Sequence, residues 1–178
     1  MPRLFIAVDL PDTIKKNLET MFFGIPGARW VASDQIHLTV RFIGDVDGAL
    51  FLDIKNTLEE VNILPFDLQL KGVGHFPPRG TPRVLWVGLE KNEPLQLLRK
   101  KIDSTLLKIG LEPERRKFSP HITLARLKNT PLQKIANFLS GNGLFCQEPF
   151  QVDDFKLYSS TLTPKGAIHK VEKVYPLR

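Results

Sequence analysis

The sequence has 178 residues, of which 42% are hydrophobic and 25% are charged, and its formal net charge at pH 7 is +6. These values are ordinary for a soluble globular chain. No apolar run approaches the roughly 18 residues of a membrane span. The single cysteine, Cys146, excludes an intrachain disulfide and a cysteine-based metal cluster. The basic excess fits an anionic partner such as RNA without requiring one.

The first residues have the pattern of a strand and not that of a secretory signal. The segment Leu4–Leu10 is apolar, but no basic start precedes it and no small-residue cleavage site follows it. We therefore expect a cytoplasmic protein. A helix is expected next, near Asp12–Phe22, because Pro11 precedes it and Asp12 suits its N-cap.

The predicted elements fall into two series with the same order, and the first series begins with the strand Leu4–Leu10 and the helix near Asp12–Phe22. The stretch HLTVRFIG, His37–Gly44, alternates as a strand, and a helix near Ala49–Val61 and a strand over Phe66–Val73 follow it. The second series consists of a strand over Val84–Leu89, a helix near Pro94–Ile109, a strand that starts at His121, a helix near Leu132–Leu139 and a strand over Phe150–Leu157. The alternating tail from Ala167 predicts one more strand.

Three sequence blocks recur in the same order. PRLFIAVDLP resembles PRVLWVGLE 80 residues later, while HLTVRFIG resembles HITLARL and PFDLQLKGVG resembles PFQVDDFKLY, each 84 residues later. The shared order and spacing indicate duplication or pseudo-symmetry. We therefore expect an α+β fold with one domain over residues 1–178, made of two pseudo-symmetric lobes. Each lobe is expected to have a mainly antiparallel sheet and outer helices, with a cleft between the lobes.

Each repeat carries one His-x-Thr motif. Side chains alternate along a strand, so His37, Thr39 and Arg41 are expected on one face of the first motif, and His121 and Thr123 on one face of the second. Imidazole titrates near neutral pH, so one ring can accept a proton while the other donates one. Threonine hydroxyls can donate hydrogen bonds to phosphate oxygens. The pair of motifs therefore predicts metal-independent phosphodiester chemistry without a cofactor.

Other interpretations of the histidines are weaker. A lone histidine on an amphipathic strand is usually structural, but the repeat-related pair favours catalysis. A metal site is disfavoured because neither motif has the spacing of a helical zinc site or an accompanying carboxylate or cysteine. His75 and His169 lack a comparable context and are expected to be non-catalytic. The basic cluster Arg115–Lys117 precedes the second motif and could steer an anionic substrate.

Paired motifs of this kind, about 80 residues apart in a duplicated chain, are similar to those of the two-histidine phosphoesterases. Within that superfamily the sequence resembles the RNA 2′,3′-cyclic phosphodiesterase family, also called 2′-5′ RNA ligases. The segments that carry the resemblance are RLFIAVDLP, IHLTVRFIGDV, GVGHFPPRGTPRVLWVGL, FSPHITLARL and STLTPKGAIHKV. The resemblance implies hydrolysis of RNA 2′,3′-cyclic phosphate ends to 2′-phosphomonoesters, with weak ATP-independent 2′-5′ ligation as a second activity.

The resemblance also implies a role for each motif residue. His37 would be the proton donor and His121 the proton acceptor, and the hydroxyls of Thr39 and Thr123 would hold the phosphate. The partner would be an RNA with a 2′,3′-cyclic phosphate terminus, for which tRNA fragments are one source. The enzyme is expected to be a monomer without cofactor, metal or membrane association.

Four further residues are candidates for the site. The family often carries an arginine five residues after the second histidine, here Arg126, although strand parity places it on the face opposite His121 unless the strand bulges. Arg41 has the right parity and is an auxiliary phosphate-binding candidate. Phe5 and Phe76 are candidates for stacking on the terminal base, although packing in the core or a loop is the commoner role of such residues.

Two alternative functions stay open from the sequence. The same fold and histidines could act on a 2′-5′ oligoadenylate, a cyclic nucleotide or the tail of a small RNA. In a different class, the protein could be an RNA- or nucleotide-binding module whose histidines do not turn over substrate.

Overall fold

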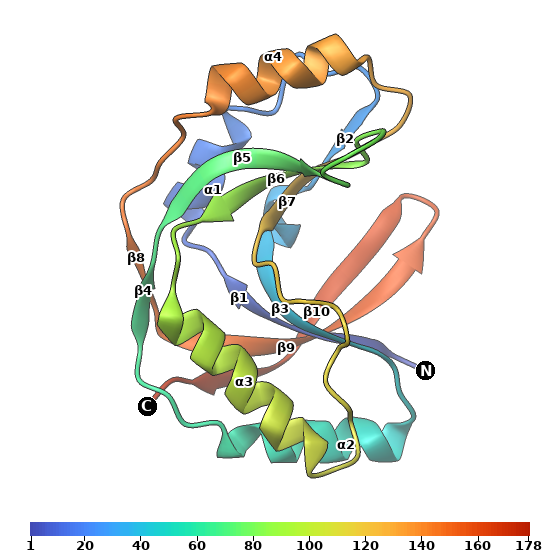
Figure 1. Cartoon of the computed structure of the whole chain (residues 1–178). Coiled ribbons are helices and arrows are strands. Elements are labelled where there is room, and N and C mark those ends of the chain that lie inside the picture. The colour runs from blue at the N-terminus through green and yellow to red at the C-terminus, as the bar shows by residue number, and fades with distance from the viewer.

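The computed structural model describes residues 1–178, which form ten strands and four α-helices (Figure 1). The strands are β1 (Arg3–Asp9), β2 (Ala28–Trp30), β3 (His37–Asp45), β4 (Phe66–Leu68), β5 (Leu70–Phe76), β6 (Val84–Leu89), β7 (Ile122–Leu127), β8 (Phe150–Val152), β9 (Asp154–Thr163) and β10 (Gly166–Pro176). The helices are α1 (Asp12–Glu19), α2 (Gly48–Thr57), α3 (Glu93–Leu107) and α4 (Leu132–Asn142).

All strand pairs are antiparallel and form two four-stranded sheets and one short two-stranded sheet. The first sheet has the order β10-β9-β1-β3, the second has the order β2-β7-β6-β5, and β4 pairs with β8. The predicted α+β class and the mainly antiparallel pairing are confirmed. Each four-stranded sheet contains one histidine-motif strand, β3 in the first and β7 in the second, and these two strands approach each other.

The closing strands of the two sequence repeats are exchanged between the sheets. β5 follows the first motif in the chain but pairs with β6 in the second sheet, and β9 follows the second motif but pairs with β1 in the first sheet. The two crossings meet where β4 pairs with β8, at the left of Figure 1. The expectation that each sequence half forms its own sheet is therefore wrong. The physical reason is that β4 and β8 pair with each other and direct the following strands across.

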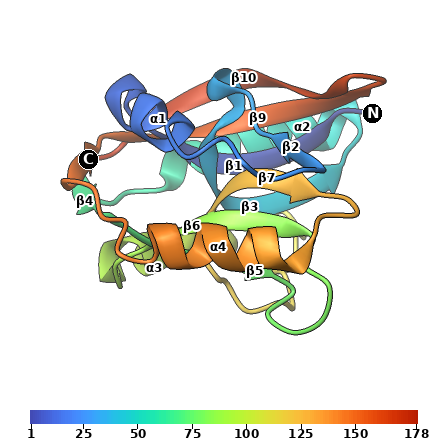
Figure 2. The same cartoon turned by 90° about the horizontal axis from the view of Figure 1, so that it is seen from above.

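Helices cover the outer faces of the two sheets. α4 lies above the second sheet, while α2 and α3 lie beneath the first (Figure 1), and the view from above shows α4 running along the strands that it covers (Figure 2). The main apolar core comprises 36 buried residues from the sheets and helices, and a second cluster comprises Phe5, Ala7 and Tyr158. None of the four helices combines the length and apolar composition that a membrane crossing requires.

Local differences from the predicted elements have simple causes. Asp12 is the first residue of α1 and not its N-cap, because Pro11 occupies the cap position and makes no side-chain hydrogen bond there. An acidic residue in the first turn still suits the helix dipole. The predicted strands over Phe66–Val73 and Phe150–Leu157 each divide in two at the crossing between the sheets. The three-residue strand β2 was not predicted from the sequence.

Candidate active site

Both motif histidines are anchored in the same way. The Nδ1 of His37 lies 2.6 Å from the carbonyl oxygen of Gln35, and the Nδ1 of His121 lies 2.8 Å from the carbonyl oxygen of Ser119. A carbonyl can only accept, so each Nδ1 carries a proton and donates it to the residue two positions earlier in the chain. In the neutral ring this leaves the Nε2 lone pair free to accept a proton. The two repeats therefore present equivalent nitrogen atoms.

The hydroxyl of Thr39 lies against the first of these nitrogens. Its Oγ1 is 2.9 Å from the Nε2 of His37, so in the neutral ring the hydroxyl donates to that nitrogen. Thr39 and Thr123 are both partly exposed, and each lies two residues after its histidine on the same strand face. The structure thus brings the imidazole of His37 beside the hydroxyl of Thr39, as the strand alternation predicts.

An aromatic cluster lies behind His37. The ring of Phe5 stacks on His37 with 5.0 Å between centroids, and Tyr158 stacks on Phe5 at 5.1 Å. The ring of His169 meets His37 edge-on at 5.3 Å and Phe5 at 4.9 Å. Burial among these rings lowers the pKa of His37 from 6.5 to about 4, because the charged imidazolium loses its hydration there.

This cluster corrects the expectation for Phe5. Alternation on β1 places Phe5 on the face opposite Leu4 and Ile6, as expected, but the side chain is only 3% exposed. Its ring packs among His37, Tyr158 and His169, and at this exposure it leaves no surface on which a nucleotide base could stack. Phe5 therefore supports the histidine and does not contact substrate.

We expect the pKa of His37 to be visible as a pH dependence of stability. The unfolded chain binds a proton at His37 below about pH 6.5 while the folded chain does not until about pH 4. The contribution of neutral His37 to the free energy of unfolding is therefore complete above pH 6.5. It is lost as the pH falls from 6.5 towards 4, by at most about 3 kcal/mol.

Histidine NMR titration of the protein without ligand checks this expectation. The His37 signals, assigned by their loss in His37→Gln, should stay in the neutral form at pH 5.5. The same variant should flatten the decrease of the unfolding free energy between pH 6.5 and 4.5. A His37 midpoint at or above pH 6.5 would contradict the burial argument.

A different set of rings surrounds His121. Phe76 meets its imidazole edge-on, with 4.8 Å between centroids, and Trp86 lies 5.4 Å from Phe76. The indole of Trp86 fits over Gly74, where an added Cβ would come within 2.3 Å of the ring. Phe76 is partly exposed beside the histidine, and base stacking by Phe76 stays a prediction.

A β-bulge in the second sheet decides the position of Arg126. The register between β6 and β7 shifts between Leu85 and Trp86, so that Trp86 lies opposite Thr123 but Val84 lies opposite Arg126. The extra residue in β7 reverses the alternation beyond Leu124. Arg126 is therefore exposed on the same face as Thr123. The sequence places Arg126 in the site only if the strand bulges, and the strand does bulge here.

The equivalent bulge in the first sheet moves Arg41 out of the site. The register between β1 and β3 skips Val40, so Ala7 lies opposite Thr39 while Ile6, a core residue, lies opposite Arg41. The expectation that Arg41 faces the phosphate is therefore wrong. The position that corresponds to Arg126 is instead occupied by Phe42, which is 61% exposed.

Arg41 is part of a buried ionic network. Its guanidinium is 3% exposed and donates to Asp103 at 2.7 Å and to the carbonyl oxygen of Glu112 at 2.7 Å. Asp103 also accepts from Arg99, which pairs with Glu114 at 3.0 Å. The network therefore ties α3 and the loop after it to β3. That loop leads directly to His121.

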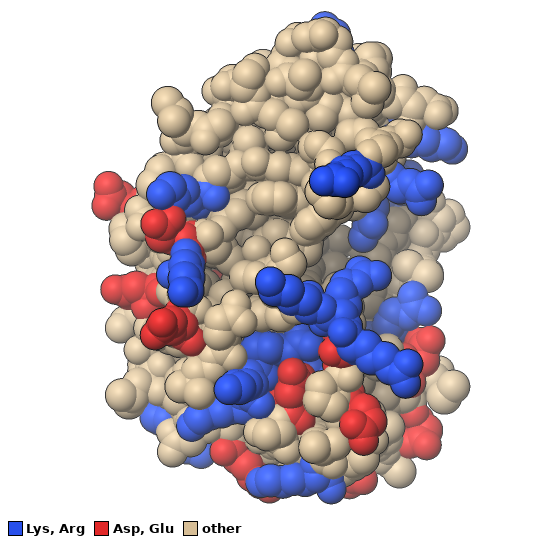
Figure 3. All heavy atoms as spheres, in the orientation of Figure 1, with Lys and Arg blue, Asp and Glu red and all other residues tan.

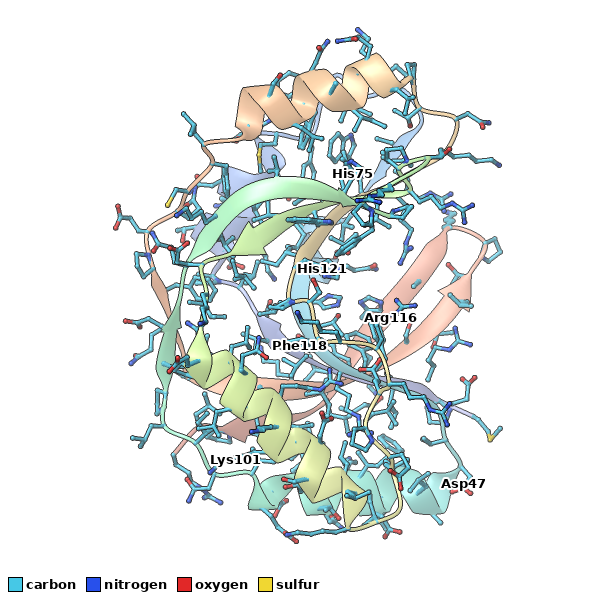
Figure 4. All side chains as sticks on the ribbon, viewed as in Figure 1. Asp47, His75, Lys101, Arg116, Phe118 and His121 are labelled. Carbon is cyan, nitrogen blue, oxygen red and sulfur yellow. The ribbon has the colours of Figure 1, made fainter.

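The loop between α3 and β7 brings positive charge towards the site. Arg115, Arg116 and Lys117 are exposed and have no carboxylate partner. Figure 4 places Arg116 and His121 between the two sheets, with Phe118 beside them. On this face of the molecule Lys and Arg side chains gather around a hollow between the upper and lower parts (Figure 3). This position agrees with the predicted steering of an anionic substrate.

Sequence reasoning missed the contribution of His169. Its ring lies against His37 and Phe5, and its Nδ1 is buried without a hydrogen-bond partner. Burial also lowers the pKa of His169, which keeps this ring neutral at pH 7. No signal in the sequence could show this contact, because it depends on the pairing of β9 with β1. His75 has no such contact: its Nδ1 bonds the carbonyl oxygen of Pro77 at 2.8 Å.

No group of three His, Cys, Asp or Glu side chains within residues 1–178 converges in a way that could hold a metal ion. A cavity of about 780 Å³ lies away from the histidines, where residues 62–66 face the start of α3. The candidate site thus comprises two imidazoles and two hydroxyls, with Arg126 on the same face as Thr123.

Two sheets that each present a His-x-Thr strand define a two-histidine phosphoesterase. The chain belongs to the 2′-5′ RNA ligase superfamily, whose family description matches residues 16–163. Its curated relatives include proteins named RNA 2′,3′-cyclic phosphodiesterase. That of Thermotoga maritima is 37% identical over 95% of this chain and 92% of the relative, and that of Archaeoglobus fulgidus is 33% identical over 97% and 99%.

Solved structures have the same fold over the whole chain. The crystal structure of TT0787 of Thermus thermophilus is 28% identical, with a TM-score of 0.81, and the alignment covers 99% of this chain and 98% of that one. Escherichia coli LigT in its apo form is 26% identical with a TM-score of 0.79, covering 99% and 98%. LigT has also been solved in complex with phosphate, at 25% identity and a TM-score of 0.72, covering 99% and 98%.

Proposed function

We propose that the protein hydrolyses RNA 2′,3′-cyclic phosphate ends to 2′-phosphomonoester ends by general acid–base catalysis without a metal ion. The observation that supports it most is the matched anchoring of His37 and His121, which gives two equivalent Nε2 atoms for two proton transfers. The relatives named RNA 2′,3′-cyclic phosphodiesterase, which align over nearly the whole chain, support the choice of substrate.

In this mechanism His121 accepts a proton from water at Nε2 while the water oxygen attacks phosphorus. The bond between phosphorus and the 3′-oxygen breaks, and His37 donates a proton from Nε2 to that oxygen. The products are a 2′-phosphomonoester and a free 3′-hydroxyl. Thr39 and Thr123 donate hydrogen bonds to the non-bridging oxygens, whose charge must be held in place. When a 5′-hydroxyl of RNA replaces water as the nucleophile, the same step forms a 2′-5′ phosphodiester, breaks the bond to the 3′-oxygen and joins two ends without ATP.

The low pKa of His37 places a condition on this assignment. With a pKa of about 4, roughly one molecule in a thousand carries the donor proton at pH 7 before substrate binds. An anionic phosphate beside the ring favours the imidazolium and raises its pKa. We therefore expect inorganic phosphate to shift the His37 NMR titration upwards. A His37 titration that phosphate leaves unchanged would contradict the assignment of His37 as the proton donor.

A direct assay tests the proposed activity. A short RNA with a 2′,3′-cyclic phosphate end, incubated with the protein in excess EDTA, is expected to yield the 2′-phosphomonoester alone. The phosphorus position of the product distinguishes it from the 3′-phosphomonoester of a ribonuclease contaminant. Survival of the cyclic end, or activity that depends on added divalent metal, would refute the mechanism. Equal turnover of 2′-5′ oligoadenylate would favour the alternative substrate.

Both histidines come from one chain, so a monomer carries a complete site under this proposal. RNA is the substrate class that the family supports. tRNA fragments as the particular substrate, and a cytoplasmic location, stay predictions from the sequence.

A further inference from the structure

Two arginines lie side by side on the site face of the second sheet. β2 pairs with β7 so that Arg29 is directly opposite Arg126, and residues directly opposite in an antiparallel pair share one face. The neighbouring Trp30 confirms which face this is. Its indole points to the other side, where it stacks on Phe22 at 4.7 Å and packs near Phe138 of α4. Arg29 and Arg126 therefore both lie on the face of Thr123.

This arginine pair has no counter-charge within the protein. Both side chains are exposed, and neither makes a hydrogen bond or an ion pair with any other residue. The arginines elsewhere that do have partners use carboxylates, such as Asp45 for Arg3 and Asp103 for Arg41. Like charges directly opposite each other in a sheet are destabilising. The pair therefore favours an external anion, and two planar guanidinium groups suit the oxygens of a phosphate.

The position of the pair relative to the motif identifies which phosphate it fits. Thr123 lies opposite Trp86 and Arg126 lies opposite Val84, two residues further along β6, which corresponds to about 7 Å. A single-stranded RNA covers this distance in about one nucleotide. The chain after β2 leads to Gln35, whose carbonyl anchors His37, so the arginine pair lies next to the segments that carry both histidines.

We propose that Arg29 and Arg126 together hold the phosphodiester one nucleotide to the 5′ side of the cyclic end, which makes an oligonucleotide and not a mononucleotide the preferred substrate. This inference rests on the proposed function and adds a second phosphate site to it. Arg29 is the residue whose substitution tests the second phosphate site alone, because Arg29 is on β2 and no motif residue is on that strand.

Three substrates test the proposal: uridine 2′,3′-cyclic phosphate, the dinucleotide UpU with a 2′,3′-cyclic phosphate end, and the same dinucleotide with an uncharged methylphosphonate linkage. The wild type is expected to have about tenfold higher kcat/KM for the charged dinucleotide than for the methylphosphonate, as a charge-assisted hydrogen bond would give. Arg29→Ala should lower kcat/KM for the charged dinucleotide by about the same factor and nearly remove this discrimination. On the mononucleotide its effect should be much smaller.

Lys134→Ala is the matched control, since it removes one exposed positive charge from α4, on the other side of the same sheet. The kcat/KM of this variant should equal that of the wild type on all three substrates. Removing one of two opposed like charges should not lower the unfolding free energy, which a urea titration of Arg29→Ala checks.

Two results would overturn the inference. One is equal turnover of the charged and methylphosphonate dinucleotides by the wild type. The other is an equal loss on all three substrates in Arg29→Ala, which would place Arg29 at the cyclic phosphate itself. If the wild type opens none of the cyclic ends, the proposed function has failed. Calorimetry then tests the arginine site on its own, with two UpU 2′-phosphates as ligands, one with a charged linkage and one with a methylphosphonate linkage. The charged ligand is expected to bind more tightly than the methylphosphonate only when Arg29 is present.

Discussion

Replacing His37 or His121 by alanine is expected to lower kcat on a cyclic-phosphate end by about 10²–10⁴-fold. Each change removes one of the two Nε2 atoms on which the proton transfers depend. Neither residue belongs to the apolar core, and each ring is partly exposed, so both variants should fold. Circular dichroism and thermal unfolding of the purified variants establish that the loss is chemical.

His75→Ala is the matched control for this experiment. The imidazole of His75, on β5, makes one side-chain hydrogen bond, to the carbonyl oxygen of Pro77. The variant should therefore retain full activity. The double variant at His37 and His121 should be little slower than either single variant, because residues that act as a unit show non-additive losses. Activity that persists in either single variant would refute the two-histidine mechanism.

Replacing Arg41 by alanine is expected to lower the free energy of unfolding by about 3–5 kcal/mol. The change leaves the Asp103 carboxylate without one of its two arginines, and it leaves the carbonyl oxygen of Glu112 without its donor. Urea titration of wild type and variant measures the difference. At temperatures where the variant stays folded, its kcat/KM should remain within a few-fold of the wild type, because Arg41 faces the core.

Arg79→Ala is the control, since Arg79 is exposed and has no ion pair, and it should leave stability unchanged. Asp103→Asn should be destabilising like Arg41→Ala, because it leaves Arg41 and Arg99 buried with less counter-charge. A loss of activity in Arg41→Ala without a loss of stability would restore Arg41 to the phosphate site. It would also contradict the register of β3.

The positions of the motif residues were largely predictable, because they depend on alternation within single strands. His37 with Thr39 and His121 with Thr123 share faces as the sequence indicates. The sheet faces on which Arg41 and Arg126 lie were not predictable, since each residue lies beyond a β-bulge. A bulge reverses the alternation, and nothing in HLTVRFIG or HITLARL marks where the extra residue falls.

Contacts between distant strands explain the other differences. The cluster of Phe5, Tyr158 and His169 behind His37 exists because β9 pairs with β1, and that pairing follows from the crossing of β4 and β8. The sequence repeat predicts which strands exist but not which of the two sheets they join. The low pKa of His37 comes chiefly from its burial, to which this cluster contributes, so the sequence could not indicate it.

The exchange of β5 and β9 gives the chain the topology of a fused dimer. Residues 1–80 alone would hold β1 and β3 without β9, and β5 without β6, so half a chain could complete both sheets only by trading strands with a second copy. Such a symmetric pair would necessarily have two identical histidines. In the fused chain the two histidines no longer have to be equivalent. The imidazole of His37 lies among buried rings, while that of His121 lies near the protein surface. The two repeats can therefore give their histidines different surroundings, which a symmetric pair of identical chains could not.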